Sequence, residues 1–369
     1  MKLLTTLLLS FLIFGATFSQ DHPTLELDQP APGFDLPGVD GKNYSLDDFD
    51  ADILVVIFTC NHCPTAQTYE DRIIDLVSTY KGKGVDFVAI SPNDPKALRL
   101  DELGYTDLGD ELEDMRIRSE YKGFDFPYLY DGEDQLVSKK YGPVATPHVF
   151  IFDKERKLKF VGRIDDSEDG ITPDTKFDTR NAIDALLAGK TPDVQQTKTF
   201  GCSIKWSDKR GDVEDYYKKI YAEAVHVEMI DEAGIRNLIG NESENLRLIN
   251  VWATWCGPCV IEFPDLVEMN FIYRHRGFEL VTISADIPDK KEEVLKFLQK
   301  NHVSGSNYQF HTKDKYALIE AVDPDWQGAL PYTILVKPGG EVLYAGQGTI
   351  DPLEIRRKIV DVLGRAKDW

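Results

Sequence analysis

The Cys-x-x-Cys pattern occurs twice, as Cys-Asn-His-Cys at 60–63 and as Cys-Gly-Pro-Cys at 256–259. An apolar run precedes each pair, and a helix-like segment follows it. The N-terminus of a helix presents unpaired N–H groups and a partial positive charge, which together stabilise a thiolate. The repeated pattern therefore predicts two strand–helix junctions that each hold a reactive dithiol. It indicates thiol–disulfide chemistry that is done twice or is passed between two centres.

The two halves of the 369-residue chain repeat one order of elements, and this length is enough for two domains with separate cores. In the first half, the patterns predict strands at 52–59, 85–90, 149–152 and 158–161, and helices at 60–80 and 177–188. In the second half, they predict strands at 246–255, 278–283, 332–336 and 341–344, and helices at 256–275, 290–301 and 352–363. A charged insertion at 93–123 and a helix at 213–225 complete the expected order.

The net charge and the N-terminal sequence limit the expected partners and location of the protein. The formal net charge is −21, which argues against a nucleic-acid backbone or an anionic membrane surface as partner. Lys2 and the apolar run at 3–14 are typical of a secretory signal, which predicts a signal peptide at 1–19 cleaved after Ser19. An uncleaved anchor is the alternative. No later segment is apolar enough to span a membrane, so we expect a periplasmic or secreted protein.

Five cysteines are an odd number for a secreted chain, in which cysteines are usually paired. Two pairs account for four of them and leave Cys202. A Cys-x-x-Cys disulfide closes a very small loop, so it restricts the unfolded chain little and would be a poor structural staple. The pairs therefore make more sense as redox couples, with purely structural disulfides as the alternative.

Longer motifs around the cysteines resemble the thioredoxin superfamily. Residues 225–369 are similar to the TlpA/ResA-like thiol–disulfide oxidoreductases, through Trp-Ala-Thr-Trp-Cys-Gly-Pro-Cys at 252–259, Glu-Phe-Pro at 262–264 and Leu-Pro-Tyr at 330–332. Residues 30–206 resemble the peroxiredoxin-like redoxin (AhpC/TSA-related) family, through motifs at 31–34, 40–42, 58–64, 146–147, 162–166 and 201–206. The resemblance implies an α/β chain of two tandem thioredoxin-like domains, each with a central mixed β-sheet flanked by helices, and leaves 207–224 as a helical linker.

At the second pair, the resemblance implies that Cys256 is the nucleophile and that Cys259 resolves the mixed disulfide. Thioredoxins use a buried Asp, six residues before the first cysteine, to take the proton from the resolving thiol. This chain has Asn250 at that position, which cannot accept a proton. Glu262 is the candidate substitute because it lies three residues after Cys259, on the same helix face. The alternative is that Glu262 is merely a solvated charge.

The resemblance also implies a cis-proline opposite each pair, Pro331 at the second site and Pro147 at the first. In this fold the backbone of the preceding residue, Leu330 or Thr146, pairs with a bound polypeptide as an added strand. An ordinary trans turn proline is the alternative.

At the first pair, we expect Cys60 and Cys63 to take the same roles as Cys256 and Cys259. His62 can give a hydrogen bond or a positive charge to the thiolate, and stabilising the reduced form makes a couple more oxidising. Electrons would then run from the second site to the first. Cys202 could pair with either cysteine during turnover, remain a buried thiol or link two chains.

Peroxide reduction by the first domain is an alternative function. Cys63, Pro64 and Thr65 match the peroxiredoxin Cys-Pro-Thr, but Thr59 stands four residues before Cys63 instead of the three that the peroxiredoxin signature requires. No activating arginine can be assigned, and Arg163 is only a candidate.

Copper binding is a second alternative, from a different class of function. Cys60, Cys63, His62 and His148 offer soft ligands for Cu(I). However, copper-delivery proteins of this fold use a longer Cys-x-x-x-Cys motif, which this chain lacks.

The function that best accounts for both pairs is a thiol–disulfide oxidoreductase of the cell envelope. Its expected partners are protein disulfides or thiols and an upstream thiol protein that supplies electrons, with peroxide as the alternative substrate. This chemistry requires no organic cofactor and no metal.

Overall fold

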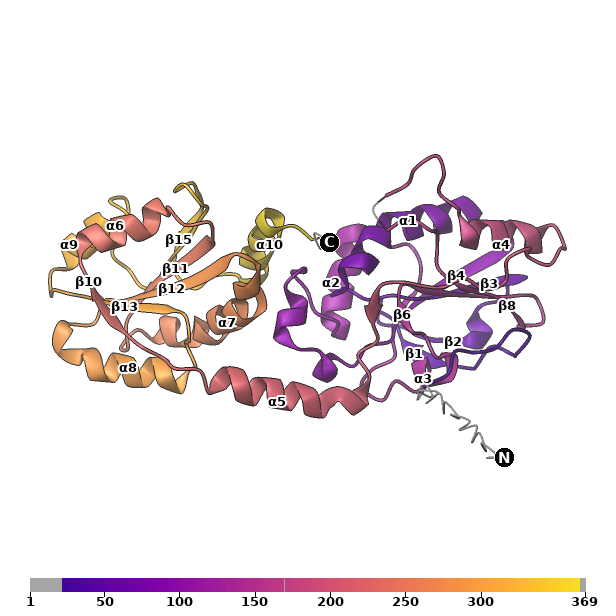
Figure 1. The fold of residues 1–369 in the computed structure, drawn as a ribbon, viewed down its shortest axis with the longest axis horizontal. Helices are drawn as coiled ribbons and strands as arrows, with labels where there is room; N and C mark the ends of the chain where they lie inside the picture. The colour runs from indigo at the N-terminus through magenta and orange to yellow at the C-terminus, as the bar shows by residue number, and fades with distance from the viewer. Residues whose placement is uncertain (1–21, 169, 366–369) are drawn as a thin grey trace, which may run out of the picture.

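The computed structural model describes residues 22–168 and 170–365, so the predicted signal peptide lies outside the described residues. Figure 1 shows two sheet-centred domains with helices on both faces of each sheet, joined by helix α5 (Arg210–Tyr221). This arrangement confirms the predicted α/β class with two tandem domains. Within the described ranges, no helix combines the length and apolar character needed to cross a bilayer.

The first sheet has five strands in mixed orientation. Their spatial order is β5 (Tyr128–Tyr130), β4 (Val85–Ser91), β3 (Ile53–Phe58), β7 (His148–Phe152) and β8 (Leu158–Gly162). The central strand β3 runs parallel to β4 and antiparallel to β7. All six residues of β3 are buried, which explains its uninterrupted apolar sequence: successive side chains enter cores on opposite faces.

Helices cover one face of this sheet, and smaller elements cover the other. The helices are α1 (Pro64–Tyr80), α2 (Leu112–Lys122) and α4 (Asp178–Leu187). The opposite face carries α3 (Ser138–Tyr141) and the hairpin of β1 (Asp35–Pro37) and β2 (Asn43–Ser45). Near the cysteines, a two-stranded sheet joins β6 (Ala145–Thr146) to β9 (Cys202–Ser203).

The second sheet has six strands and repeats this plan. Its order is β10 (Glu228–Ile230), β13 (Ser306–Phe310), β12 (Phe278–Ser284), β11 (Leu246–Trp252), β14 (Tyr332–Val336) and β15 (Val342–Gln347). The first four strands in this order run parallel to one another. Strand β14 pairs antiparallel with β11, and β15 pairs antiparallel with β14. One face packs on α7 (Gly257–Tyr273), α8 (Lys291–Lys300) and α10 (Pro352–Leu363), and the other on α6 (Glu232–Gly240) and α9 (Lys315–Val322).

The linker helix differs from the prediction of a helix at 213–225. Helix α5 begins at Arg210 and ends at Tyr221. The following chain leaves the helix, and Val225 and Val227 enter the core of the second domain. Tertiary burial of these two side chains thus sets the end of the helix, which the helical spacing alone could not reveal.

The predicted insertion at 93–123 provides the contact between the domains. Its short helix η3 (Leu100–Leu103) packs against α7. The Tyr273 hydroxyl donates a hydrogen bond to the Thr106 carbonyl at 2.8 Å. Asp107, whose side chain is 1% exposed, pairs with Arg357 at 3.2 Å and also with Arg365. The first domain therefore contacts the C-terminal ends of α7 and α10.

This contact separates the two cysteine pairs along α7. The helix has 17 residues and so extends about 25 Å. Cys256 lies at its N-terminus, whereas Tyr273, which bonds to the first domain, lies at its C-terminus. The second pair is thus at the end of α7 remote from the domain contact.

Candidate functional site

The second cysteine pair lies at the start of α7, as predicted. Cys256 is the N-cap residue of the helix, and its sulfur accepts a hydrogen bond from the Cys259 N–H at 3.3 Å. The two cysteines form a disulfide. Cys256 is 5% exposed and Cys259 is 0% exposed. The outer cysteine is therefore the one that occupies the positive end of the helix.

Glu262 lies buried on the same helix and is only 2% exposed, which contradicts the alternative of a solvated charge. Its carboxylate accepts hydrogen bonds from the Asn250 side-chain amide at 2.8 Å and from the Ile350 N–H at 3.2 Å. Burial raises the pKa of Glu262, and the hydrogen bond from Asn250 offsets only part of this effect. Asn250, which stands where thioredoxins have an Asp, therefore donates a hydrogen bond to the buried carboxylate of Glu262.

Both expected cis-prolines are present, since the Thr146–Pro147 and Leu330–Pro331 peptide bonds are cis. Beside Leu330 lies a pocket of about 300 Å³ with mostly apolar lining. Its lining residues are Trp255, Ala285, Lys315, Tyr316, Leu318, Ile319, Trp326, Gln327, Gly328 and Leu330. Trp255 is 66% exposed next to Cys256, whereas Trp252 is buried against Phe263. The second disulfide therefore adjoins an exposed apolar surface.

The first cysteine pair has a different register relative to its helix. Helix α1 begins at Pro64, so Cys63 is the N-cap, and its sulfur accepts a hydrogen bond from the Ala66 N–H at 3.3 Å. The expectation of equal roles placed Cys60 at the helix start, but Cys60 precedes it by one turn of chain. Pro64 accounts for the difference, because proline lacks an N–H and favours the first position of a helix.

The surroundings of the first pair distinguish its two thiols. Burial alone would raise the pKa of Cys63, but hydrogen bonds with Cys202 and Cys60, together with the charge of His62, lower it well below its usual range. Burial raises the pKa of Cys60, whose sulfur lies 3.2 Å from the Thr146 hydroxyl. Cys63 is therefore the thiol that the first domain stabilises as a thiolate.

A buried carboxylate, Asp110, holds the loop between the two cysteines. It accepts hydrogen bonds from the Asn61 N–H at 2.9 Å, the His62 N–H at 3.0 Å and the Asn93 amide at 2.7 Å. The carboxylate oxygen that accepts from Asn93 also lies 2.5 Å from His62 Nδ1. No sequence motif indicated this role, because Asp110 lies in the charged insertion at 93–123.

The His62–Asp110 pair supplies the positive charge beside Cys63. Burial would lower the pKa of His62, but the charge and hydrogen bond of Asp110 raise it. The same attraction lowers the pKa of Asp110 despite its burial. The pair therefore favours an imidazolium next to the Cys63 thiolate. The prediction of Cys60 as the activated thiol is wrong, because burial raises the pKa of Cys60.

Cys202 lies directly against the first pair. Strand β9 runs antiparallel to β6, with Cys202 opposite Thr146. The Cys202 N–H donates a hydrogen bond to Cys63 Sγ at 3.4 Å. A pocket of about 370 Å³ lies beside it, lined by His62, Pro64, Arg99, Asp101, Glu102, Tyr105, Cys202, Ser203 and Lys205. The structure thus brings together the three cysteines, Thr146 and Pro147, which were predicted from separate motifs.

The predicted copper ligands do not form one group. Among the described residues, the potential ligand atoms of Cys60, His62 and Asp110 lie within 4.8 Å of one another, without His148. His148 accepts a hydrogen bond from the Val144 N–H at 3.3 Å, and burial lowers its pKa to about 3. The Asp110 oxygens are occupied by N–H donors. This geometry favours a hydrogen-bonded network over a metal site.

The candidate activating arginine also lies elsewhere. Arg163 forms an ion pair with Asp178, at the start of α4, at 2.7 Å. Arg99, which lines the pocket beside Cys202, was not singled out from the sequence.

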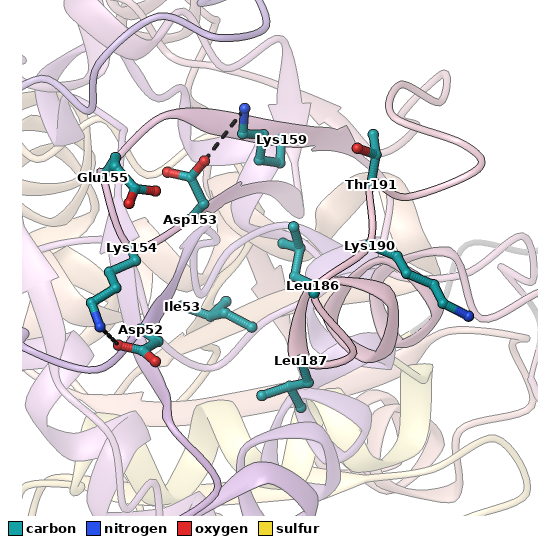
Figure 2. A pocket seen from close by; sticks show the side chains of 11 residues that line it. Asp52, Ile53, Asp153, Lys154, Glu155, Lys159, Leu186, Leu187, Lys190 and Thr191 are labelled. Carbon is teal, nitrogen blue, oxygen red and sulfur yellow. Dashed lines mark ion pairs between the residues drawn. The ribbon is translucent and has the colours of Figure 1, made fainter.

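A further pocket of about 370 Å³ lies at the other end of the first sheet (Figure 2). It adjoins Ile53 at the start of β3, whereas the cysteine pair follows the end of that strand. Lys154 pairs with Asp52 at 3.2 Å, and Lys159 pairs with Asp153 at 3.3 Å. This pocket is therefore separate from the cysteine site, and its lining contains no thiol.

Comparison with family models covers both domains. Residues 27–161 match the AhpC/TSA family, and residues 244–342 match a thioredoxin-like family. The chain is a tandem of two thioredoxin-superfamily domains. The matches agree with the two resemblances found in the sequence motifs, and each matched segment contains one Cys-x-x-Cys pair.

Individual relatives match one domain at a time. The thiol-disulfide oxidoreductase ResA of Oceanobacillus iheyensis is 32% identical over 115 residues, which is 29% of this chain and 53% of the relative. The thiol:disulfide interchange protein HelX of Rhodobacter capsulatus is 28% identical over 125 residues, 33% of this chain and 64% of the relative. The chain spans about half the length of the first of these relatives.

Solved structures also match one domain. The crystal structure of an uncharacterized conserved protein from Geobacillus kaustophilus is 39% identical, with a TM-score of 0.44. The match covers 49% of this chain and 92% of that protein.

Proposed function

We propose that this chain is a thiol–disulfide oxidoreductase of the cell envelope that exchanges disulfides through both Cys-x-x-Cys pairs. The observation that carries the proposal is the second site. There a disulfide caps a helix beside an exposed apolar surface, and a buried carboxylate lies behind it. The relatives named as thiol–disulfide oxidoreductases match this domain and support the same chemistry.

In the reduced state, Cys256 attacks a substrate disulfide and forms a mixed disulfide, releasing one substrate thiol. Cys259 then attacks the Cys256 sulfur, releases the second substrate thiol and leaves the Cys256–Cys259 disulfide. Cys259 must lose a proton in this step. Glu262 is the proton acceptor in our proposal, because burial raises the pKa of its carboxylate towards that of a thiol. An upstream thiol protein restores the dithiol.

Reduction of insulin disulfides by the full chain, with dithiothreitol as electron source, tests this activity. We expect Cys256→Ser to abolish the second-site contribution and Cys259→Ser to accumulate a mixed disulfide with insulin. Val260→Ala is a matched control, because this neighbouring residue on α7 is 40% exposed. Full activity of the Cys256→Ser chain, measured with the first pair also replaced by serine, would contradict the proposal.

Thiol peroxidase activity of the first domain is a second candidate, supported by the stabilised Cys63 thiolate and by the AhpC/TSA match. Hydrogen peroxide would oxidise the Cys63 thiolate, and a second thiol would resolve the product as a disulfide with loss of water. Consumption of hydrogen peroxide by the reduced chain, compared with Cys63→Ser, tests this candidate. Equal consumption by both chains would eliminate it.

The envelope location rests on the signal-like N-terminus. Mass spectrometry of the protein recovered from a fractionated host measures it directly. We expect the mature chain to begin at Gln20 in the periplasmic or secreted fraction. An intact N-terminus in the cytoplasm would contradict this location.

A further inference from the structure

The two sites differ in whether a strand of the same chain pairs with the residue that precedes the cis-proline. At the second site, no strand within the described residues pairs with the Leu330 backbone. At the first site, Thr146 is already paired, because β9 of the same chain lies antiparallel to it with Cys202 directly opposite. A polypeptide can add as a strand only to an unpaired edge. The first site is therefore closed to this mode of substrate binding.

The close approach of β9 depends on Gly201. This residue has a φ of +134°, and a Cβ atom built on it would lie 2.0 Å from the Thr146 carbonyl oxygen. Side chains larger than hydrogen are excluded at that distance, so only glycine permits this contact. The pairing of β9 with β6 thus relies on a specific residue next to Cys202.

The burial of the three sulfurs shows which one an outside reactant meets. Cys63 is 0% exposed and Cys60 is 3% exposed. Cys202 is partly exposed and lines the pocket of about 370 Å³, whereas neither Cys60 nor Cys63 is among the lining residues. A sulfur that enters this pocket therefore reaches Cys202 before the buried pair.

Cys202 is also in contact with the sulfur that the domain stabilises as a thiolate. Its N–H donates to Cys63 Sγ at 3.4 Å, and its side chain packs against the cluster of Cys60, Cys63 and Ala66. A thiolate next to a second sulfur is the arrangement that disulfide exchange requires.

We propose that Cys202 is a catalytic residue that carries disulfides between the buried Cys60–Cys63 pair and substrates outside. This inference rests on the proposed exchange function and adds a third reacting sulfur to the first site. An external disulfide is attacked by Cys202, which forms a mixed disulfide and releases one thiol. The Cys63 thiolate then attacks the Cys202 sulfur, so that a Cys63–Cys202 disulfide forms and the second external thiol leaves.

Cys60 completes the sequence by losing its proton and attacking the Cys63 sulfur. The Cys60–Cys63 disulfide forms, and Cys202 leaves as a thiolate that takes up a proton. Two electrons have passed from the Cys60–Cys63 dithiol to the external disulfide, which has become two thiols. The reverse sequence reduces the pair again. No oxidant or reductant besides the external disulfide or thiol is needed.

Oxidation by glutathione disulfide tests this role in the full chain, with Cys256→Ser and Cys259→Ser present so that only the first site reacts. Alkylation followed by mass spectrometry follows formation of the Cys60–Cys63 disulfide. We expect Cys202→Ser to slow this formation at least about tenfold, a difference of about 1.4 kcal/mol in the barrier. Lys198→Ala is the control, because this exposed residue lies in the same segment and outside the pocket lining.

A second variant keeps the test independent of folding defects in Cys202→Ser. In Cys60→Ser, the last step is blocked, so we expect the Cys63–Cys202 disulfide to accumulate. Oxidation of Cys202→Ser at the parent rate, or glutathione attached to Cys63 in Cys60→Ser, would overturn the inference. The insulin assay at Cys256 is separate, so its failure would overturn the proposed function and not the role of Cys202.

Discussion

The first cysteine of the pair caps the helix at the second site, whereas the second cysteine does so at the first site. Cys256 is the N-cap of α7, and Cys63 is the N-cap of α1. The proline that follows Cys63 directly sets this register, whereas Gly257 separates Cys256 from its proline. Two identical Cys-x-x-Cys spacings can therefore place different thiols at the positive end of a helix.

The two sites differ as much in access as in register. The second disulfide borders an exposed apolar surface with Trp255 at its edge. The first pair lies beneath its own strand β9 and is approached through Cys202. We therefore expect the second site to act on polypeptides directly and the first to act through Cys202.

The largest effect is expected from Glu262→Gln. This variant removes the proposed proton acceptor for Cys259, so we expect second-site exchange to slow about 100-fold while first-site exchange is unchanged. In the parent chain, this rate should fall as the pH drops through the raised pKa of Glu262, because the protonated carboxyl cannot accept a proton. The pH dependence of insulin reduction measures both effects.

Glu244→Gln is the matched control for this variant, because Glu244 is exposed and lies outside the site. A Glu262→Gln chain with the parent rate and the parent pH profile would contradict the role of Glu262 as the proton acceptor for Cys259.

Gly201→Ala tests the covering of the first site. The added methyl group cannot fit against the Thr146 carbonyl, so we expect β9 to move away and the fold to lose about 1–3 kcal/mol. With the edge exposed, we expect insulin adducts at Cys63, which the parent chain does not form. Gly211→Ala is the control, because a Cβ atom there meets no neighbour within 4 Å. Unchanged stability and unchanged adduct formation would contradict the covering role of β9.

Asp110→Asn tests the origin of the Cys63 thiolate. Loss of the carboxylate should lower the pKa of His62, remove its positive charge and thereby raise the pKa of Cys63. We expect the rate of Cys63 alkylation at neutral pH to fall about tenfold and its pH profile to move to higher pH. Asp125→Asn, at a side chain that is 47% exposed, serves as control. An unmoved pH profile would leave Asp110 with only a structural role.

The smallest effect concerns the reduction potentials of the two pairs. Because the first domain stabilises the Cys63 thiolate, its reduced form is favoured and the couple is more oxidising. We expect the first pair to lie at least about 30 mV above the second, which favours electron flow from the second site to the first. Redox titration against glutathione, with each pair replaced in turn by serine, measures this difference. A more reducing first pair would reverse the proposed direction.

Local sequence patterns predicted the central strands of both sheets and both cysteine pairs, because β3 is an uninterrupted apolar run and β11 is mostly apolar. The edge strands β5 and β10 and the strand β13 were missed. The family resemblance predicted the two cis-prolines. Asp110 could not be predicted in this way, since a contact across 48 residues leaves no periodic signal. The covering strand was also missed: the motif at 201–206 identified Cys202, but two residues of strand are too short to predict from sequence. The register of α1 was within reach, because Pro64 is a known helix-start signal.

Trapping of polypeptide adducts tests the contrast between the two sites most directly. The Cys259→Ser chain and the Cys60→Ser chain, the latter with Cys256→Ser and Cys259→Ser also present, are each reduced and incubated with oxidised insulin. Mass spectrometry then locates each mixed disulfide. We predict insulin at Cys256 in the first chain, and in the second a Cys63–Cys202 disulfide with no insulin at Cys63. Insulin attached to Cys63 as rapidly as to Cys256 would contradict the account.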